Sequence, residues 1–234
     1  MILFHGANSA GAELAPLVEA LRPYCAVRTP DLLGHGGRAI PERIAMRELA
    51  DDVVAWMDRE GIESDVIGGY SFGGTLALYI ARHHPRRARG VVALAAKHVF
   101  DAATMRHWSH LVGHERLAGM KFPWGTRVEE LARIHAPNAW QTVADVNARL
   151  FATLAQTPPF GPDDLRAIAA PVMIVSSNLD QIVPWEETLA LGKLIPGSHI
   201  AMFYGPAHPL RAIPLAPIAR TIDQWMGAKG LRAG

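Results

Sequence analysis

Cysteine is nearly absent from this chain of 234 residues, in which Cys25 is the only one. A single thiol excludes an internal disulfide and fits a reducing compartment. No apolar stretch reaches the roughly 20 residues that a membrane-spanning helix needs. Residues 1–4 lead straight into a glycine turn without the charged start of a secretory signal. We therefore predict a cytoplasmic protein that has no membrane partner.

An excess of charge of one sign is also missing, because the formal net charge is only +1. The one basic cluster, at residues 82–89, surrounds the end of an expected helix, where cations stabilise the helix dipole and the exposed carbonyls. The chain also lacks a glycine-rich phosphate loop and paired cysteines with metal-ligand spacing. These absences argue against a nucleic-acid partner, and we expect no metal and no cofactor.

Short apolar runs alternate with helical patterns over most of the chain. The runs expected to be strands are 1–4, 25–29, 66–70, 90–95, 171–176 and 199–203. The segments expected to be helices are 12–21, 44–59, 75–81, 185–195 and 213–226. Alternation at this spacing predicts right-handed βαβ units, and hence an α/β fold with a mostly parallel sheet that helices cover on both faces.

Residues 97–162 interrupt this alternation with several helical patterns and no convincing strand. Because a structureless loop of that length is uncommon in a compact domain, we predict a helical cap inserted into a core of residues 1–96 and 163–234. Five aromatic residues of this segment are expected mostly to form its own core, with one or two facing a cleft: Trp108, Phe122, Trp124, Trp140 and Phe151.

The sequence Gly69-Tyr70-Ser71-Phe72-Gly73 lies between an expected strand and an expected helix. Glycines on both sides of a serine allow the strand and the helix to approach closely and to hold the serine in a strained backbone conformation. The hydroxyl of such a serine points outward, beside the free N–H groups at the start of the helix. The pattern therefore predicts a nucleophile elbow with Ser71 at its tip.

A serine hydroxyl is a poor nucleophile near neutral pH and needs a base, which in turn needs an orienting carboxylate. In a parallel sheet the reactive groups gather at the carboxyl ends of the strands. Asp180 is the only carboxylate in the loop after the strand expected at 171–176. His208 is the only histidine in the loop after the strand expected at 199–203. Asp101, which follows the strand expected at 90–95, is the alternative acid.

Four motifs together resemble the α/β-hydrolase superfamily, in the group with a helical cap: His5-Gly6, Pro30-Asp31 with Gly34-His35-Gly36, the elbow at Ser71, and the spaced Asp180 and His208. The resemblance implies that Ser71 attacks a carbonyl carbon, that His208 moves the proton and that Asp180 orients His208. It also implies an oxyanion hole formed by the backbone N–H groups of Phe72 and Ala7. Members of the superfamily carry further strands before the His-Gly loop. The resemblance therefore implies an N-terminally shortened sheet of about six strands, or a start upstream of residue 1.

The elbow and the resemblance together predict an enzyme, a serine hydrolase that cleaves a carboxylic ester, lactone or thioester of a small-molecule substrate. Two alternatives use the same triad in relatives: hydrolysis of a carbon–carbon bond next to a ketone, and cofactor-free perhydrolase or haloperoxidase-like chemistry. An alternative of another class is a ligand-binding receptor on a hydrolase fold. A pure binding module has no physical need for a strained elbow aligned with a base, which argues against this last reading.

Histidine is abundant, with 11 residues, and most of them fit structural roles. His5 and His35 are expected to bond the backbone near the site rather than to react. His107, His110 and His114 are spaced so that one helix face could present them as metal ligands. No acidic residue lies inside this spacing as in a zinc protease, so an exposed helix face is the preferred interpretation.

Overall fold

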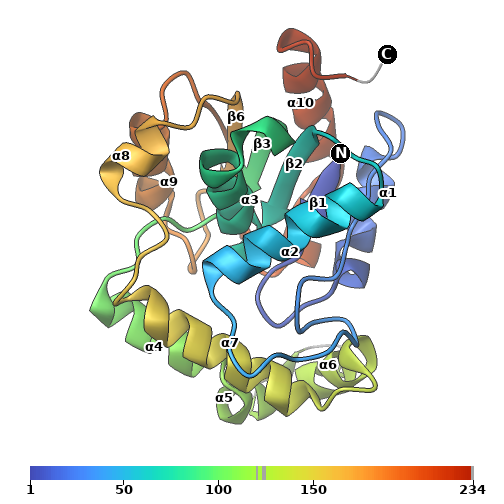
Figure 1. Cartoon of the computed structure of the whole chain (residues 1–234), viewed down its shortest axis with the longest axis vertical. Coiled ribbons are helices and arrows are strands. Elements are labelled where there is room, and N and C mark those ends of the chain that lie inside the picture. Colours follow the sequence, from blue (N-terminus) through green and yellow to red (C-terminus); the bar gives the residue numbers. More distant parts are fainter. Residues whose placement is uncertain (120, 123–124, 233–234) are drawn as a thin grey trace.

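A five-stranded, wholly parallel sheet lies at the centre of the structure, a computed structural model that describes residues 1–119, 121–122 and 125–232 (Figure 1). Neighbouring strands follow one another in chain order, as β1-β2-β3-β6-β7. Their bounds are β1 Ile2–Phe4, β2 Asp65–Tyr70, β3 Ala88–Leu94, β6 Val172–Ser177 and β7 His199–Phe203. Because every pair is parallel, the carboxyl ends of the strands lie along one edge of the sheet.

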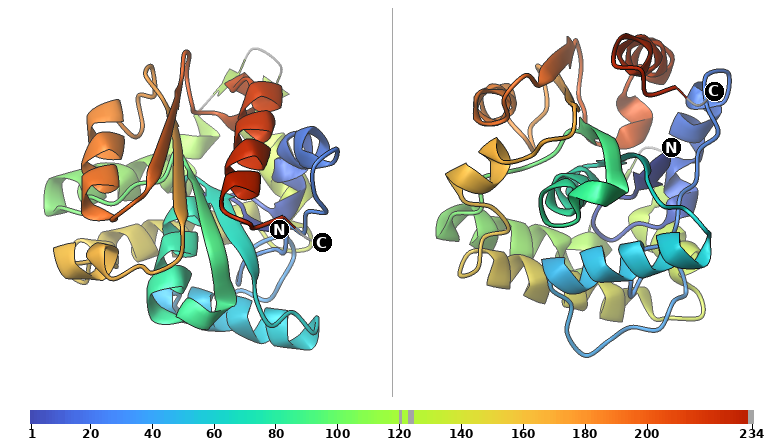
Figure 2. Two further views of the ribbon diagram at one scale, coloured as in Figure 1. Left: turned by 90° about the horizontal axis from the view of Figure 1, so that it is seen from above. Right: turned by 45° about the horizontal axis from the view of Figure 1, so that its top comes forward.

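Helices cover both faces of this sheet, as the alternation of patterns predicted (Figure 2). The helices α1 and α10 lie on one face, and α2, α3, α8 and α9 lie on the other. Their bounds are α1 Ala15–Leu21, α2 Met46–Arg59, α3 Phe72–His83, α8 Pro162–Arg166, α9 Trp185–Leu194 and α10 Leu215–Ala228, with 3₁₀ turns at Gly11–Leu14, Pro85–Arg87 and Leu210–Ala212. None of the helices in the described residues is long and apolar enough to cross a membrane.

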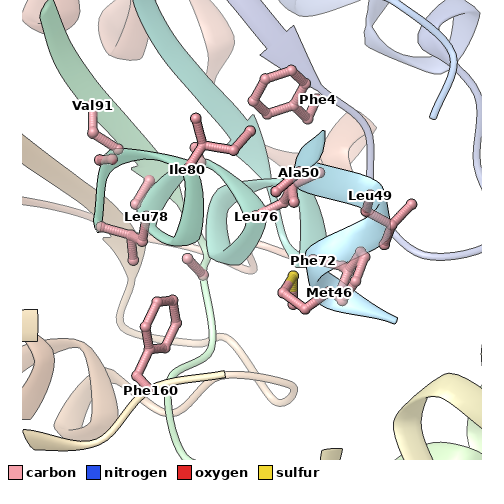
Figure 3. Packing of buried hydrophobic residues seen from close by; sticks show 14 of the residues in the cluster. Phe4, Met46, Leu49, Ala50, Phe72, Leu76, Leu78, Ile80, Val91 and Phe160 are labelled. Carbon is pink, nitrogen blue, oxygen red and sulfur yellow. The ribbon is translucent and has the colours of Figure 1, made fainter. Parts of the chain in front are cut away.

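Apolar side chains of β1, β2, β3 and β6 enter two separate hydrophobic cores. Ile2 and Phe4 of β1 join the cluster that contains α2, α3 and α9, whereas Leu3 between them joins the cluster that contains α1 and α10. Figure 3 shows part of the first cluster, where side chains from β1, α2 and α3 gather. Burial of one such Leu, Ile or Phe side chain contributes about 1.5–3 kcal/mol. The two cores together hold the ends of the strands in fixed positions.

The expectation of a strand at 25–29 is wrong. Only Arg28 forms a bridge, to Ile2, where the Leu3 N–H donates to the Arg28 carbonyl oxygen over 2.8 Å. Pairing ends there because Pro30 has no N–H to donate and restricts the backbone of the residue before it. The sheet therefore has five strands among the described residues, where about six were expected.

The chain between β3 and β6 is helical for most of its described length (Figure 1). It contains α4 Ala102–Val112, α5 His114–Ala118, α6 Arg127–His135 and α7 Trp140–Leu154, and α4 packs along α7. The expectation of no strand here is wrong, because β4 Lys121–Phe122 and β5 Gly125–Thr126 pair in antiparallel fashion. Strands of two residues are too short to show a period-two pattern in the sequence.

A buried ion pair fixes the start of this segment against α9. Lys97 Nζ lies 2.6 Å from Glu187 Oε2, and both side chains are largely buried. Glu187 Oε1 also accepts the backbone N–H groups of His98 and Val99, each over 2.9 Å. These bonds compensate a carboxylate that would be costly to bury alone. They therefore set the direction in which the chain leaves β3.

The turn between β2 and α3 is tight because backbone atoms meet across it. Ser71 has φ 54° and ψ −120°, a strained combination for a residue with a Cβ atom. A Cβ on Gly73 would lie 2.2 Å from the Phe4 carbonyl oxygen, and one on Gly69 would lie 2.3 Å from the Gly73 carbonyl carbon. Glycine is therefore required at both positions for β1, β2 and α3 to pack this closely.

Replacing Gly73 by alanine is expected to lower the free energy of unfolding by about 3 kcal/mol or more, since a backbone carbonyl in a sheet cannot move aside. Gly113→Ala is the matched control, because the nearest neighbour of a Cβ there is at 3.4 Å, an ordinary contact. Urea unfolding of the two variants beside the wild type measures the difference. Equal free energies of unfolding for the two variants would show that the close approach of Gly73 to the Phe4 carbonyl does not require glycine.

Candidate active site

The predicted site residues lie at the carboxyl ends of the strands. Ala7 follows β1 and Ser71 follows β2. Asp180 follows β6 and His208 follows β7. A cavity of about 450 Å³ is lined by Ala7, Ser71 and His208, while Asp180 is buried and contacts the His208 ring. The parallel sheet thus brings together residues that are far apart in the sequence.

Ser71 occupies the position before the first residue of α3, where a helix has free N–H groups. Neither the N–H of Phe72 nor that of Ala7 donates a hydrogen bond to a described residue. Both residues line a second, smaller cavity, which Ser71 also lines. Two unpartnered backbone donors around one serine are the arrangement that stabilises an oxyanion.

The Asp180 carboxylate holds the His208 ring. His208 Nδ1 lies 2.9 Å from Oδ1 and 3.0 Å from Oδ2 of Asp180. Oδ1 also accepts the backbone N–H groups of Ile182 over 2.8 Å and Val183 over 3.2 Å, which fix the carboxylate. Because an ionised carboxylate only accepts hydrogen bonds, Nδ1 carries the proton of the neutral imidazole. The other nitrogen, Nε2, is then free to accept a proton.

His208 Nε2 is buried and has no hydrogen-bond partner among the described residues. Most buried polar side-chain atoms in folded proteins have such a partner. His208 and Ser71 line the same cavity, although no bond joins Nε2 to the Ser71 hydroxyl in the described structure. Catalytic hydrogen bonds of this kind often become short only when substrate is bound. Nε2 is therefore an unpartnered atom of a residue that lines the same cavity as Ser71.

Tyr70 connects the strand that carries Ser71 to the loop that carries His208. The Tyr70 hydroxyl donates to the Ala207 carbonyl oxygen over 3.0 Å. Its ring lies against the His208 ring, with the centroids 5.0 Å apart. Burial raises the pKa of Tyr70, so the hydroxyl keeps its proton as a donor. No pattern in the sequence indicated this contact, because it joins two segments that only the fold brings together.

The structural roles expected for His5 and His35 are confirmed. His5 Nε2 accepts the Leu32 N–H over 3.1 Å, and His5 Nδ1 lies 2.9 Å from the Gly6 carbonyl oxygen. His35 Nδ1 lies 3.0 Å from the Leu33 carbonyl oxygen. Both side chains are buried. His5 thus joins the loop after β1 to the loop around residue 33, and His35 bonds within the latter loop.

A buried polar network extends from His35 into the helical segment. The Asn147 amide nitrogen lies 2.9 Å from both the Asn8 side-chain oxygen and His35 Nε2. His135 Nε2 lies 3.3 Å from the Asn8 carbonyl oxygen. Asn8 has a positive φ of 54° and directly follows Ala7. Through this network α6 and α7 fix the conformation of the loop that holds the Ala7 N–H.

Residues 1–214 match the model of the alpha/beta hydrolase family. The chain belongs to this family. A 2-hydroxymuconate semialdehyde hydrolase from Pseudomonas putida is 24% identical to it over 226 residues, which cover 86% of this chain and 76% of that protein. A pimeloyl-(acyl-carrier protein) methyl ester esterase from Vibrio campbellii is 25% identical over 227 residues, which cover 89% of this chain and 87% of that protein.

The solved structure of a thermophilic esterase from Thermogutta terrifontis resembles this hydrolase with a TM-score of 0.77, at 22% identity, over 97% of this chain and 89% of that chain. Together with the family match, this likeness confirms the α/β-hydrolase fold that the motifs implied. The prediction of a hydrolase is confirmed as well.

Asp101, the alternative acid, lies away from these residues in the hydrolase. It is exposed and forms the N-cap of α4, where its side chain accepts the Thr104 N–H over 2.9 Å. Neither cavity beside Ser71 is lined by Asp101. Hydrogen bonds from Thr104 lower the pKa of this carboxyl. Its geometry fits a helix cap rather than a partner for His208.

His107, His110 and His114 do not gather into a ligand set. The first two lie on α4, whereas His114 begins α5 and its ring is 2.6 Å from an Asp145 oxygen. In the parts of the chain that the structure describes, no group of three or more His, Cys, Asp or Glu residues is arranged to hold a metal ion.

Two of the five aromatic residues considered for the cleft line cavities beside Ser71. Trp108 lines both cavities, and Phe151 lines the smaller one. Trp140 instead packs in a cluster with Leu117, Leu131 and Ala144 within the helical segment. Trp124 and the side chain of Phe122 lie outside the described residues.

Sequence reasoning missed a charged pair on the wall of the larger cavity. Arg127 Nη1 lies 3.2 Å from Glu13 Oε1 and 2.7 Å from Glu130 Oε2. Both Glu13 and Arg127 line the cavity, and burial raises the pKa of the Glu13 carboxyl. No signal joins these residues in the sequence, because the loop after β1 and α6 meet only in the folded chain.

Acid is expected to destabilise this hydrolase through its buried histidines. Burial lowers the pKa of His5 from 6.5 to about 4. Burial, together with the charge of His5, lowers the pKa of His35 to about 3. Between pH 6.5 and about 4 the unfolded chain therefore binds protons that the folded chain does not. Folding stability should fall as the pH drops through this range, by about 1.4 kcal/mol per pH unit for each histidine.

Urea unfolding at a series of pH values through this range measures the slope. His35→Gln is the informative variant, because glutamine keeps one donor and one acceptor while it removes the ionisation. We expect its stability to depend less steeply on pH than that of the wild type, by about 1.4 kcal/mol per pH unit. If the free energy of unfolding depends on pH equally steeply in the two proteins, folding does not lower the pKa of His35.

Proposed function

We propose that this hydrolase cleaves carboxylic esters through an acyl-enzyme intermediate, with Ser71 as nucleophile, His208 as base and Asp180 as the residue that orients His208. The observation that carries the proposal is the His208 ring itself. Its Nδ1 is held by a buried carboxylate, its Nε2 has no partner among the described residues, and His208 lines the cavity that Ser71 also lines. A base held in one tautomer beside a serine at a helix start is the geometry of acyl transfer.

In the first half of the reaction, Ser71 Oγ bonds to the carbonyl carbon and passes its proton to His208 Nε2. The oxyanion accepts hydrogen bonds from the N–H groups of Ala7 and Phe72. The carbon–oxygen bond to the leaving group then breaks, and His208 returns the proton to the departing oxygen. In the second half, water loses its proton to His208 and bonds to the acyl carbon. The bond from that carbon to Ser71 Oγ then breaks, and His208 returns the proton to Ser71 Oγ as the acid leaves. A positioned base contributes about 10²–10⁴-fold and one oxyanion donor about 10²–10³-fold to the rate.

The helical segment 97–162 then acts as a cap over a core formed by residues 1–96 and 163–234. Trp108 of α4 lines both cavities, and Asn147 of α7 bonds the loop that carries Ala7. Substrate is a small molecule enclosed between the two parts. A cytoplasmic location fits the single thiol, Cys25, which is half-buried and free.

Ser71→Ala is expected to lower the rate of p-nitrophenyl ester hydrolysis by at least about 10³-fold, because it removes the nucleophile. A fluorophosphonate probe should label the wild type at Ser71 and should not label the variant. Ser64→Ala is the control, since Ser64 lies at the opposite end of β2 and makes no side-chain hydrogen bond with a described residue. A folded wild type that neither hydrolyses esters nor takes the label would favour the ligand-binding alternative.

Asp180→Asn is expected to lower kcat by about 10³-fold or more, because the amide also donates and so favours the wrong tautomer of His208. Asp101→Asn should leave kcat nearly unchanged, since asparagine caps a helix as well as aspartate does. Steady-state kinetics of the two variants compare the two candidate acids directly. A large loss in Asp101→Asn alone would transfer the role of the acid to Asp101.

Hydrolysis of a carbon–carbon bond next to a ketone is the second candidate function. The similarity to 2-hydroxymuconate semialdehyde hydrolase over most of both chains favours it. The same serine, base and oxyanion hole would serve, with a carbon atom accepting the proton in place of oxygen. A comparison of kcat/KM for a p-nitrophenyl ester and for a dienol ketone substrate decides between the two functions, provided that both rates depend on Ser71.

A further inference from the structure

Two cavities of very different size meet at Ser71. The larger has a volume of about 450 Å³, and the smaller has a volume of about 30 Å³. A cavity needs at least about 10–15 Å³ of such space to hold a water molecule, so the smaller cavity has room for one small group. By the same measure, the larger cavity has room for a substituent many times bulkier. An ester bound at Ser71 must place its acyl group in one of these cavities and its leaving group in the other.

The position of His208 decides which side of the ester enters which cavity. His208 lines the larger cavity and does not line the smaller one. A leaving group must receive its proton from the base, so its oxygen has to lie within hydrogen-bond reach of His208 Nε2. The leaving group therefore occupies the larger cavity. The acyl group, which stays on Ser71, is directed into the smaller one.

The walls of the smaller cavity are rigid and mostly apolar. Phe72, Phe100 and Phe151 are buried, and so is Val183. The Phe151 ring packs on Phe72, with the ring centroids 5.5 Å apart. Close packing of this kind does not open readily for extra atoms. The cavity therefore accepts little more than the methyl group of an acetyl ester.

The larger cavity also suits the second half of the reaction. Water has to reach the acyl carbon from the side of His208, and the space that the leaving group vacates lies on that side. Its wall carries the Glu13 and Arg127 side chains, so a bulky leaving group meets polar as well as apolar atoms there.

We propose that this enzyme is selective for esters of a very short acyl group, acetyl in size, with a bulky leaving group. The proposal rests on the function proposed above, because it uses His208 as the acid for the leaving group. It assigns the smaller cavity to the acyl chain and the larger cavity to the alcohol.

Benzyl acetate and methyl phenylacetate test this assignment as a matched pair. The two esters are isomers, and both release an alkyl alcohol, but the bulky group is on the alcohol in the first and on the acyl side in the second. We expect kcat/KM for benzyl acetate to exceed that for methyl phenylacetate by at least tenfold, since one methylene in a fixed pocket changes kcat/KM by about 10–200-fold. Equal values, or the reverse order, would overturn the proposal.

Phe151→Leu opens the smaller cavity with a mild change of volume, and it should raise kcat/KM for p-nitrophenyl butyrate relative to p-nitrophenyl acetate by about tenfold. Leu179→Ala is the control, because Leu179 lines only the larger cavity and is half exposed. Leu179→Ala should alter the order of kcat/KM among esters of different alcohols. It should leave the ratio of kcat/KM for p-nitrophenyl butyrate to that for p-nitrophenyl acetate unchanged. A wild-type optimum at butyrate or a longer chain would contradict the proposal without any variant.

Failure of this proposal is distinct from failure of the proposed function. If methyl phenylacetate is the better substrate and Ser71→Ala abolishes its hydrolysis, the serine mechanism stands and the assignment of the cavities is wrong. If neither isomer is hydrolysed and the fluorophosphonate does not label Ser71, the hydrolytic function itself fails, and the size proposal fails with it.

Discussion

Contact between backbones at the elbow is the constraint on which the rest of the site depends. With glycine at 69 and 73, the first turn of α3 packs directly against the Phe4 carbonyl at the end of β1. The same approach sets the distance between the loop after β1 and the start of α3. Ser71 is held between them in its strained conformation. A unit of three segments therefore fixes the serine and both unpartnered N–H groups together.

A second constraint is the burial of one carboxylate. The Asp180 side chain is fully buried, and its charge is compensated by two backbone N–H groups and by the His208 ring. Because an uncompensated buried charge is costly, the loop after β6 must fold so that those N–H groups point inward. The loop after β7 is held in turn by the Tyr70 hydroxyl, which bonds the Ala207 carbonyl oxygen. Electrostatics thus orders two irregular segments that the sheet alone leaves undefined.

The sequence predicted what local patterns and topology determine. The elbow at Ser71 is a local pattern, and strand order restricts the search for Asp180 and His208 to two loops. Tyr70 contacts Ala207, and Asn147 contacts His35. No pattern in the sequence predicts these contacts, because the segments that they join are far apart along the chain. For the same reason the sizes of the two cavities were not predictable, since each wall is built from several elements. The expected strand at 25–29 failed because Pro30, which has no N–H to donate, ends the pairing after the single bridge of Arg28 to β1.

The helices α4 to α7 leave the sheet at β3 and return at β6, and these two strands are hydrogen-bonded neighbours. Because β3 and β6 are parallel, this connection runs from the carboxyl end of β3 back to the amino end of β6. Loop-closure entropy grows only with the logarithm of length, by about 0.6 kcal/mol for each doubling. The sheet can thus tolerate a longer, shorter or rebuilt insertion at small thermodynamic cost. The segment between β3 and β6 can in that way change while the strand ends that position Ser71, Asp180 and His208 stay as they are.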